Sequence, residues 1–335
     1  MVGADDAPTI ADVLAAAERI APFTRRTPVV RSDELDTRFG ARLLFKCEHL
    51  QHSGAFKYRG ATNAVQSLTD GAAANGVATH SSGNHGQALA MAARTRGIAC
   101  HVVMPHDSVR VKLDAVRAQG ATVHLCDPTM ASREAGLERV LAVTGATPVH
   151  PFAAPSVIAG QGTAVMELLA DHPDIDVVLT PVGGGGLISG SAIAAHAHSP
   201  AIHVVGAEPA GACDAHDSLT SGVRVTHHVP DTICDGLRGT IGAINFAVMR
   251  DRDVTVVLIS DAEIVRAMSL VRTTLRCVIE PSSATVVAAL ARYPEHFRRR
   301  TVGVVLSGGN VETDRATCTS GERRSGTPAT PSIDR

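Results

Sequence analysis

The sequence predicts an α/β protein built from two open parallel sheets with helices on their faces. Three observations support this fold class. The chain has 335 residues, more than a single hydrophobic core usually supports. Its 44% hydrophobic content includes only 3% aromatic residues and no Trp, as is typical of helix-rich α/β proteins. Apolar runs of strand length also alternate with helical patterns along most of the chain.

The first alternation lies between residues 76 and 149. Three apolar runs are each followed by a helical pattern, an order that calls for parallel strands joined by right-handed crossovers. The predicted strands are residues 77–80, 100–104 and 121–126, and the predicted helices are residues 87–95, 109–119 and 132–144.

A second alternation follows and predicts a second sheet. Its strands are residues 177–182, 203–207, 254–259 and 301–306, and its helices are residues 161–170, 187–196, 261–275 and 282–291. We therefore expect a large domain of residues 1–76 and 149–314 and a small domain of residues 77–148. Residues 315–335 lack apolar periodicity and are rich in Ser, Thr, Gly, Pro and Arg, which predicts a disordered tail.

Charge and cysteine content narrow the class of partner. The net charge is −2 and no basic stripe is present, so we expect a small-molecule partner and no nucleic acid. Seven Cys without a C-x-x-C pair favour free thiols in a reducing compartment. The N-terminus lacks the features of a signal peptide and no run is long enough for a membrane span, so we expect a cytoplasmic protein without a membrane partner.

A run of four glycines follows one predicted strand and precedes a helix. Gly183, Gly184, Gly185 and Gly186 allow backbone N–H groups to approach an anion closely, and the helix start adds unpaired donors. The alternative is a flexible turn, but four glycines in a short connection lose much conformational entropy on folding. No G-K-[ST] follows, which argues against a nucleoside-triphosphate loop. The pattern predicts a phosphate site.

A lysine between two aromatic residues begins another helical stretch. Lys57 lies in the segment Ser53–Gly60, SGAFKYRG, where aromatic shielding and the helix start would lower its pKa and favour a neutral amine. Taken alone, such a lysine is more often simply solvated. A second polar loop, SSGNHG at residues 81–86, directly follows the strand predicted at residues 77–80, where ligands of parallel sheets bind.

Together these segments and SGGN at residues 307–310 resemble the serine racemase and serine/threonine dehydratase family of fold-type II pyridoxal-phosphate enzymes. The resemblance covers about residues 10 to 313. It implies that Lys57 forms the Schiff base with pyridoxal 5'-phosphate and moves the α-proton. It further implies that the glycine run holds the phosphate, that Asn84 hydrogen-bonds the 3-oxygen and that Ser307 faces the pyridine nitrogen. A homodimer is expected by the same resemblance.

The resemblance also places the substrate. Ser81, Ser82 and His85 would bind the α-carboxylate, and we expect His85 to be the only one of the 16 histidines in the site. A hydroxyl beside the pyridine nitrogen makes the ring a weaker electron sink, which favours β-elimination. We therefore predict an ammonia-lyase that converts L-serine, L-threonine or 3-hydroxyaspartate to a keto acid and ammonia. In the racemases the residue matching Ser82 is the second base, so a serine or aspartate-type racemase using Lys57 and Ser82 is the alternative.

Two departures from the racemases weaken that alternative. Phe152 replaces an Asn found in many of them, and Gly239 replaces a Ser of the mammalian type. A binding module that kept the fold is disfavoured because Lys57 is retained. A lyase forming C–S bonds is disfavoured because SSGNHG looks more like the dehydratase loop.

An acidic loop follows the strand predicted at residues 203–207. Glu208 and Asp214, with the Ala212 carbonyl, match the divalent-cation site of the serine racemases, and such oxygen ligands suit Mg²⁺, Ca²⁺ or Mn²⁺. From spacing alone, the two carboxylates would be read as solvated. His227 and His228 are interpreted as surface residues.

Arg133 begins the helix predicted at residues 132–144, where the helix dipole favours carboxylates rather than a cation. It could pair with Glu134 or Glu138 on the surface. In the racemase-like proteins the matching Arg faces the substrate cleft, and a guanidinium there could grip a second carboxylate. The resulting hypothesis is that Arg133 holds the β-carboxylate of 3-hydroxyaspartate.

Overall fold

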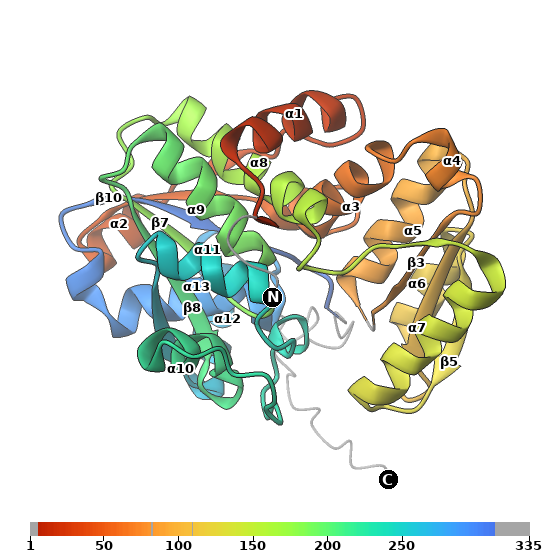
Figure 1. The fold of residues 1–335 in the computed structure, drawn as a ribbon. Helices are drawn as coiled ribbons and strands as arrows, with labels where there is room; N and C mark the ends of the chain where they lie inside the picture. Colours follow the sequence, from red (N-terminus) through yellow and green to blue (C-terminus); the bar gives the residue numbers. More distant parts are fainter. Residues whose placement is uncertain (1–5, 82, 109, 312–335) are drawn as a thin grey trace, which may run out of the picture.

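Two sheets of unequal size organise the chain in the computed structural model, which describes residues 6–81, 83–108 and 110–311. The larger sheet has six strands in the order β1-β2-β10-β7-β8-β9, and the smaller has four in the order β5-β4-β3-β6. All neighbouring strands are parallel except β1 and β2. The protein thus has the predicted fold class, with one antiparallel edge strand added (Figure 1).

The larger sheet is buried on both faces, so its strands are almost continuously apolar. Its strands are β1 (Val29–Val30), β2 (Arg42–Lys46), β7 (Val177–Pro181), β8 (His203–Pro209), β9 (Thr255–Ile259) and β10 (Thr301–Val305). One core on this sheet includes side chains of α2 (Asp33–Phe39), α12 (Asp261–Thr274) and α13 (Pro281–Arg292). The other includes α8 (Pro155–Asp171), α9 (Gly186–His198), α10 (Asp214–Ser221) and α11 (Ala243–Asp251).

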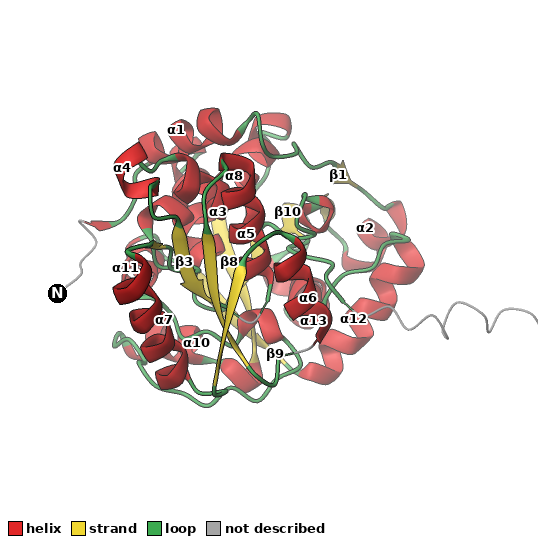
Figure 2. Cartoon of the chain, turned by 90° about the vertical axis from the view of Figure 1, so that its right-hand side faces the viewer, coloured by secondary structure: helices red, strands yellow, loops and turns green. Residues whose placement is uncertain are grey.

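The smaller sheet contains β3 (Val77–His80), β4 (Cys100–Pro105), β5 (Thr122–Cys126) and β6 (Thr147–Pro148). One face packs on α3 (Lys57–Gln66), α5 (Asn84–Arg96) and α6 (Arg110–Ala118), and the other packs on α7 (Met130–Thr144). Figure 2 shows this end of the molecule with α5, α6 and α7 around β3. Helix α3 therefore contributes to the small-sheet core although it precedes the predicted boundary, and the division into two domains remains a prediction.

The remaining elements are short or peripheral. Helix α1 (Ile10–Ile20) packs on α8, and α4 (Asp70–Ala73) precedes β3. Short 3-10 turns lie at Glu48–Leu50, Ala210–Ala212, Asp235–Leu237 and Pro294–His296. Within the described residues, no helix combines the length and apolar character that crossing a membrane requires. The predicted tail, residues 315–335, lies outside the described residues.

Candidate active site

Lys57 is positioned by the end of the central strand β10. The segment before it forms an isolated bridge between Ala55 and Gly308, and the amide of Phe56 donates to the carbonyl of Ser307 over 2.9 Å. Helix α3 begins at Lys57 itself. The structure therefore brings Lys57 and Ser307 together, although 250 residues of sequence separate them.

The amine of Lys57 lies in a partly buried, aromatic setting. Its Nζ donates to the carbonyl of Pro151 over 2.9 Å and lies 5.1 Å from the ring centroid of Phe56 and 6.0 Å from that of Phe152. Burial lowers the pKa of Lys57 to about 8, while the negative charge of Glu280 opposes the shift. An appreciable fraction of this amine is therefore neutral near physiological pH.

The other two lysines of the chain are engaged elsewhere. Lys46 is fully buried and donates to Glu167 over 2.6 Å, and Lys112 forms an ion pair with Asp235. Both are paired directly with a carboxylate, whereas Lys57 donates to a neutral carbonyl, so Lys57 is the lysine best placed to act as a nucleophile.

A buried ionic cluster fixes helix α3, and sequence reasoning missed it. Arg59 is fully buried and donates over 2.8 Å from Nε to Glu48 and from Nη1 to Glu167. Because each charge is paired, burial costs far less than it would for an isolated ion. The cluster holds the start of α3, and hence Lys57, against α8. The only sequence signal is an Arg two residues after the lysine, in a helix with no acidic residue to pair with it.

The glycine run lies between β7 and α9 with no room for side chains. A Cβ at Gly184 would lie 2.4 Å from the Phe152 ring, and one at Gly185 would lie 2.7 Å from the Cβ of Asn245. Gly185 also has a φ of 89°, which disfavours any residue with a side chain. Helix α9 starts at Gly186, so its first amides have no partner within the helix. The geometry fits a phosphate.

The serine loop ties the smaller sheet to the larger one. Ser81 Oγ accepts hydrogen bonds from the amides of Gly83 and Gly86, over 3.3 and 3.1 Å, at the start of α5. Asn84 Nδ2 donates to both carboxylate oxygens of Glu280, over 2.9 and 3.0 Å. Asn310 donates to Asn84 Oδ1 over 2.9 Å. The two sheets are thus linked beside Lys57. The predicted second base, Ser82, lies outside the described residues.

Three histidines, His80, His85 and His150, lie near one another beside the serine loop. His85 is buried with Nε2 3.3 Å from the carbonyl of Val149, and burial holds its pKa well below the usual value. The rings of His80 and His150 lie 6.0 Å apart, between centroids. The structure thus places His80 and His150 near His85, and the expectation that His85 is the only histidine of the site stays a prediction. The sequence contains one signal for the other two histidines, which is their position. His80 is the last residue of β3, and His150 directly precedes Pro151.

Arg133, in the first turns of α7, is near enough to His80 for its charge to act on that ring. Its Nε is buried and has no hydrogen-bond partner among the described residues. The pKa of His80 is lowered, first by burial and then by the positive charge of Arg133. No ion pair joins Arg133 to Glu134 or Glu138 in the described part of the chain. The surface pairing considered from the sequence is not observed.

The acidic pair is buried rather than solvated. Glu208 accepts from the amides of Ala215 and His216 over 3.0 and 2.8 Å, and Asp214 Oδ2 accepts from the amide of Ile241 over 2.6 Å. Burial raises the pKa of Glu208 well above its usual value and also raises the pKa of Asp214. Glu208 lies within β8, which runs two residues further than predicted.

His228 faces this pair, so its interpretation as a surface residue was wrong. Its Nε2 lies 3.3 Å from Asp214 Oδ1, and the side chain is only 15% exposed. The segment between α10 and α11 folds back over the carboxylates. Ala212 is buried in the turn directly before α10. Within the described residues, no group of three or more His, Cys, Asp or Glu side chains could hold a metal ion.

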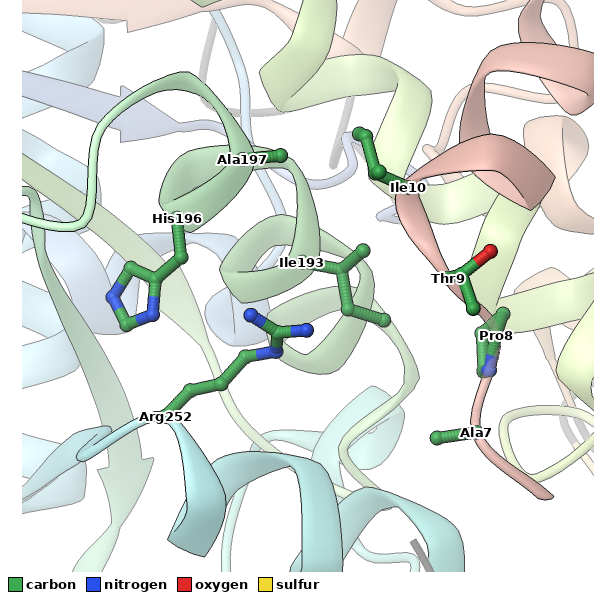
Figure 3. A pocket seen from close by; sticks show the side chains of 8 residues that line it. All are labelled: Ala7, Pro8, Thr9, Ile10, Ile193, His196, Ala197 and Arg252. Atoms are coloured by element: carbon green, nitrogen blue, oxygen red, sulfur yellow. The ribbon is translucent and has the colours of Figure 1, made fainter. Parts of the chain in front are cut away.

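A pocket of about 420 Å³ lies elsewhere, between the N-terminal segment and α9. Figure 3 shows Arg252 and His196 on one side of it and the segment Ala7–Ile10 on the other. Its lining contains none of the predicted site residues. The candidate active site is therefore the group around Lys57, the glycine run and the serine loop.

Comparison with known proteins agrees with this geometry. Residues 20–308 match the family described as "Pyridoxal-phosphate dependent enzyme". The chain is 46% identical over 308 residues to a beta-hydroxyaspartate dehydratase of Paracoccus denitrificans, covering 92% of this chain and 98% of that one. It is 42% identical over 309 residues to a serine racemase of Dictyostelium discoideum, covering 91% and 95%. The structure of maize serine racemase matches with a TM-score of 0.90 and 40% identity, covering 93% and 96%.

The fold and the lysine site together define an enzyme of the fold-type II class. The chain belongs to the family of pyridoxal-phosphate dependent enzymes.

Proposed function

We propose that this enzyme is a dehydratase that converts a dicarboxylic β-hydroxy amino acid, 3-hydroxyaspartate, to a keto acid and ammonia. The observation that carries the proposal is that the buried Nε of Arg133 has no hydrogen-bond partner in the described part of the chain, while its charge acts on His80 beside the serine loop. A second carboxylate would satisfy this guanidinium with charge-assisted hydrogen bonds. The similarity to a beta-hydroxyaspartate dehydratase supports the same substrate.

The residues around Lys57 fit pyridoxal phosphate. The four glycines bring backbone amides to the start of α9, where a Cβ would collide with Leu237, Phe152 or Asn245, and Lys57 offers an amine with a pKa of about 8. When bound, the cofactor withdraws electrons from the substrate α-carbon. We assign the phosphate to Gly183–Gly186, the pyridine nitrogen to Ser307 and the 3-oxygen to Asn84.

The chain's own groups supply the proton transfers and orient the substrate. Lys57 Nζ removes the α-proton, because its lowered pKa leaves a neutral amine able to accept it. Ser81 and His85, with Ser82 of the same loop, bind the α-carboxylate. Glu280 holds Asn84 through two hydrogen bonds and so fixes the serine loop against the larger sheet.

A divalent cation is the second group we propose, held by Glu208, Asp214 and the Ala212 carbonyl. Two buried carboxylates with raised pKa values are stabilised by a bound cation, and the contact that Asp214 Oδ1 makes is an ion-pair contact of 3.3 Å to His228 Nε2 rather than a hydrogen bond. The ion would stabilise the end of β8 and the start of α10 and take no part in the chemistry.

Racemisation is the second candidate, favoured by the 42% identity to a serine racemase. It would use Lys57 and Ser82 as the two bases, one on each side of the α-carbon. Chiral chromatography of reaction mixtures distinguishes the two, because a racemase accumulates the opposite enantiomer without forming keto acid.

Steady-state assays of 3-hydroxyaspartate, L-serine and L-threonine test the substrate. We expect the highest kcat/KM for 3-hydroxyaspartate. Arg133→Ala should lower kcat/KM for 3-hydroxyaspartate by roughly ten- to a hundredfold, because one charge-assisted contact is lost, and should affect serine much less. Arg139→Ala, an exposed Arg of the same helix, is the matched control. Equal losses on both substrates, or no turnover of 3-hydroxyaspartate by the wild type, would contradict the proposal.

A further inference from the structure

The three consecutive residues 150–152, between β6 and α8, all lie beside Lys57. The carbonyl of Pro151 accepts from Lys57 Nζ over 2.9 Å. The ring of Phe152 lies 6.0 Å from the same Nζ and covers the glycine run. The first of the three, His150, is the one whose function these contacts leave unassigned.

His150 is held in one tautomer. Its Nδ1 accepts hydrogen bonds from the amides of Phe152 and Ala153, over 3.4 and 3.1 Å. A ring nitrogen that accepts carries no proton, so the proton of the neutral ring is on Nε2. The ring stands nearly perpendicular to that of Phe152, with centroids 4.5 Å apart. The orientation of the Nε2–H bond is therefore fixed by the backbone and by an aromatic neighbour.

The same imidazole stays neutral at physiological pH. His150 is an exposed residue, yet protein atoms around its ring displace enough water to lower its pKa to about 4, with further lowering by His80 and Lys57. Its Nε2 has no hydrogen-bond partner among the described residues. His150 thus presents a single neutral donor to the open side of the site.

His150 and His80 are neighbours, and Arg133 is near enough to His80 for its charge to act on that ring; we call these three residues the distal cluster. The rings of His150 and His80 meet edge to face at 6.0 Å, and the charge of Arg133 acts on His80. These residues come from three separate segments: the loop after β6, the end of β3 and the first turns of α7. Arg133 supplies a cation, and His150 supplies a neutral donor of fixed orientation. Together they are suited to bind an anion with several acceptor atoms.

We propose that Nε2–H of His150 donates a hydrogen bond to the second carboxylate of the dicarboxylic substrate, next to the charge contact from Arg133. His150 is then a specificity-determining residue, because serine and threonine have no second carboxylate to accept this bond. This inference rests on the proposed function. It adds a residue that selects the substrate by hydrogen bonding rather than by charge.

Two substitutions of His150 test the Nε2–H donor separately from the hydrogen bonds that Nδ1 accepts from the backbone. His150→Asn keeps an acceptor for the amide two residues later, as Asn does in Asx turns, and removes the distal donor. His150→Gln keeps a donor near the position of Nε2. His101→Asn, at the amino end of β4, is the matched control. Cofactor absorbance and circular dichroism of each holoenzyme show whether the fold is kept.

The measurement is the ratio of kcat/KM for 3-hydroxyaspartate to kcat/KM for L-serine, together with the dissociation constant of the unreactive dicarboxylate maleate. Losing one hydrogen bond from a neutral donor to a carboxylate should lower the ratio and weaken maleate binding by about tenfold or more in His150→Asn. His150→Gln should retain more of both, and His101→Asn should match the wild type. In an Arg133→Ala background the effect of His150→Asn should shrink, because both residues act on one carboxylate.

The outcomes separate a failure of the proposed function from a failure of the inference about His150. If wild-type enzyme neither turns over 3-hydroxyaspartate nor binds maleate more tightly than propionate, the proposed function and this inference both fail. If the wild type does both and His150→Asn keeps its ratio and its maleate affinity, only the inference is overturned. Equal losses in His150→Asn and His150→Gln would also overturn it, because the distal donor would then be irrelevant.

Discussion

The two sides of the site are built in opposite ways. On the larger sheet, Gly183–Gly186 are completely surrounded, and a Cβ at any of them would approach another atom to within 3 Å. On the smaller sheet, His80, Ser81 and Asn84 are half-buried, and a Cβ at Gly83 would meet nothing within 4 Å. Close packing thus shapes the glycine run, whereas the serine loop is more open and less tightly packed. Variation on the smaller sheet should change selectivity, and variation on the larger sheet should change cofactor retention.

Removing Lys57, toward which both sides face, should give the largest effect. Lys57→Ala should lower activity by at least about a thousandfold, because the nucleophile and the proton acceptor are the same group. Borohydride reduction of wild type followed by peptide mapping should place the cofactor on Lys57. An adduct on Lys46 or Lys112 would contradict the assignment of the site.

Adding a side chain to the closely packed glycine run should destabilise the protein. In Gly184→Ala the new methyl group would overlap the Phe152 ring, and such overpacking typically costs about 1–3 kcal/mol. We expect a lower Tm and weaker retention of pyridoxal phosphate on dialysis. Phe152→Ala in the same chain should relieve part of the loss, and Gly71→Ala, where a Cβ meets nothing within 4 Å, is the control. If Gly184→Ala behaves like Gly71→Ala, the glycine run is less rigid than its packing indicates.

The environment of Lys57 predicts how cofactor capture depends on pH. Burial lowers its pKa to about 8, so the neutral amine dominates above that pH and falls about tenfold per pH unit well below it. The rate at which apoprotein captures pyridoxal phosphate, followed by absorbance between pH 6 and 9, should rise and then level off near pH 8. A rate still rising steeply at pH 9 would mean that the amine is as basic as a solvated lysine.

The smallest effect should come from the acidic pair at the end of β8, which belongs to the packed side. Chelation of divalent cations should lower the Tm of wild type by roughly 2–5 °C, and added Mg²⁺ or Ca²⁺ should restore it by mass action. Asp214→Ala should abolish both responses. Asp217→Ala, exposed on the same helix, should keep them. Identical responses in wild type and Asp214→Ala would exclude the cation site.

Much of the fold follows from local sequence patterns. The strand predicted at residues 77–80 coincides with β3, and the predicted helices at residues 87–95, 132–144 and 282–291 fall within α5, α7 and α13. Periodicity finds such elements because each one buries an apolar face along its own length. It does not find β6, which has two residues and is defined by pairing with β3.

The sequence by itself determined the residues whose type and local order are characteristic of a pyridoxal-phosphate site. They are a lysine before a helix, four glycines after a strand and a polar loop after another strand. Residue type and local order are enough for these, because only glycine lets a backbone come so close to an anion. The tertiary structure decided what no local pattern contains. It placed Phe152 over Gly184, Glu280 against Asn84, and His80, His150 and Arg133 on one side of Lys57. Burial and neighbouring charges, which set the pKa of Lys57 and the tautomer of His150, exist only once distant segments are packed together.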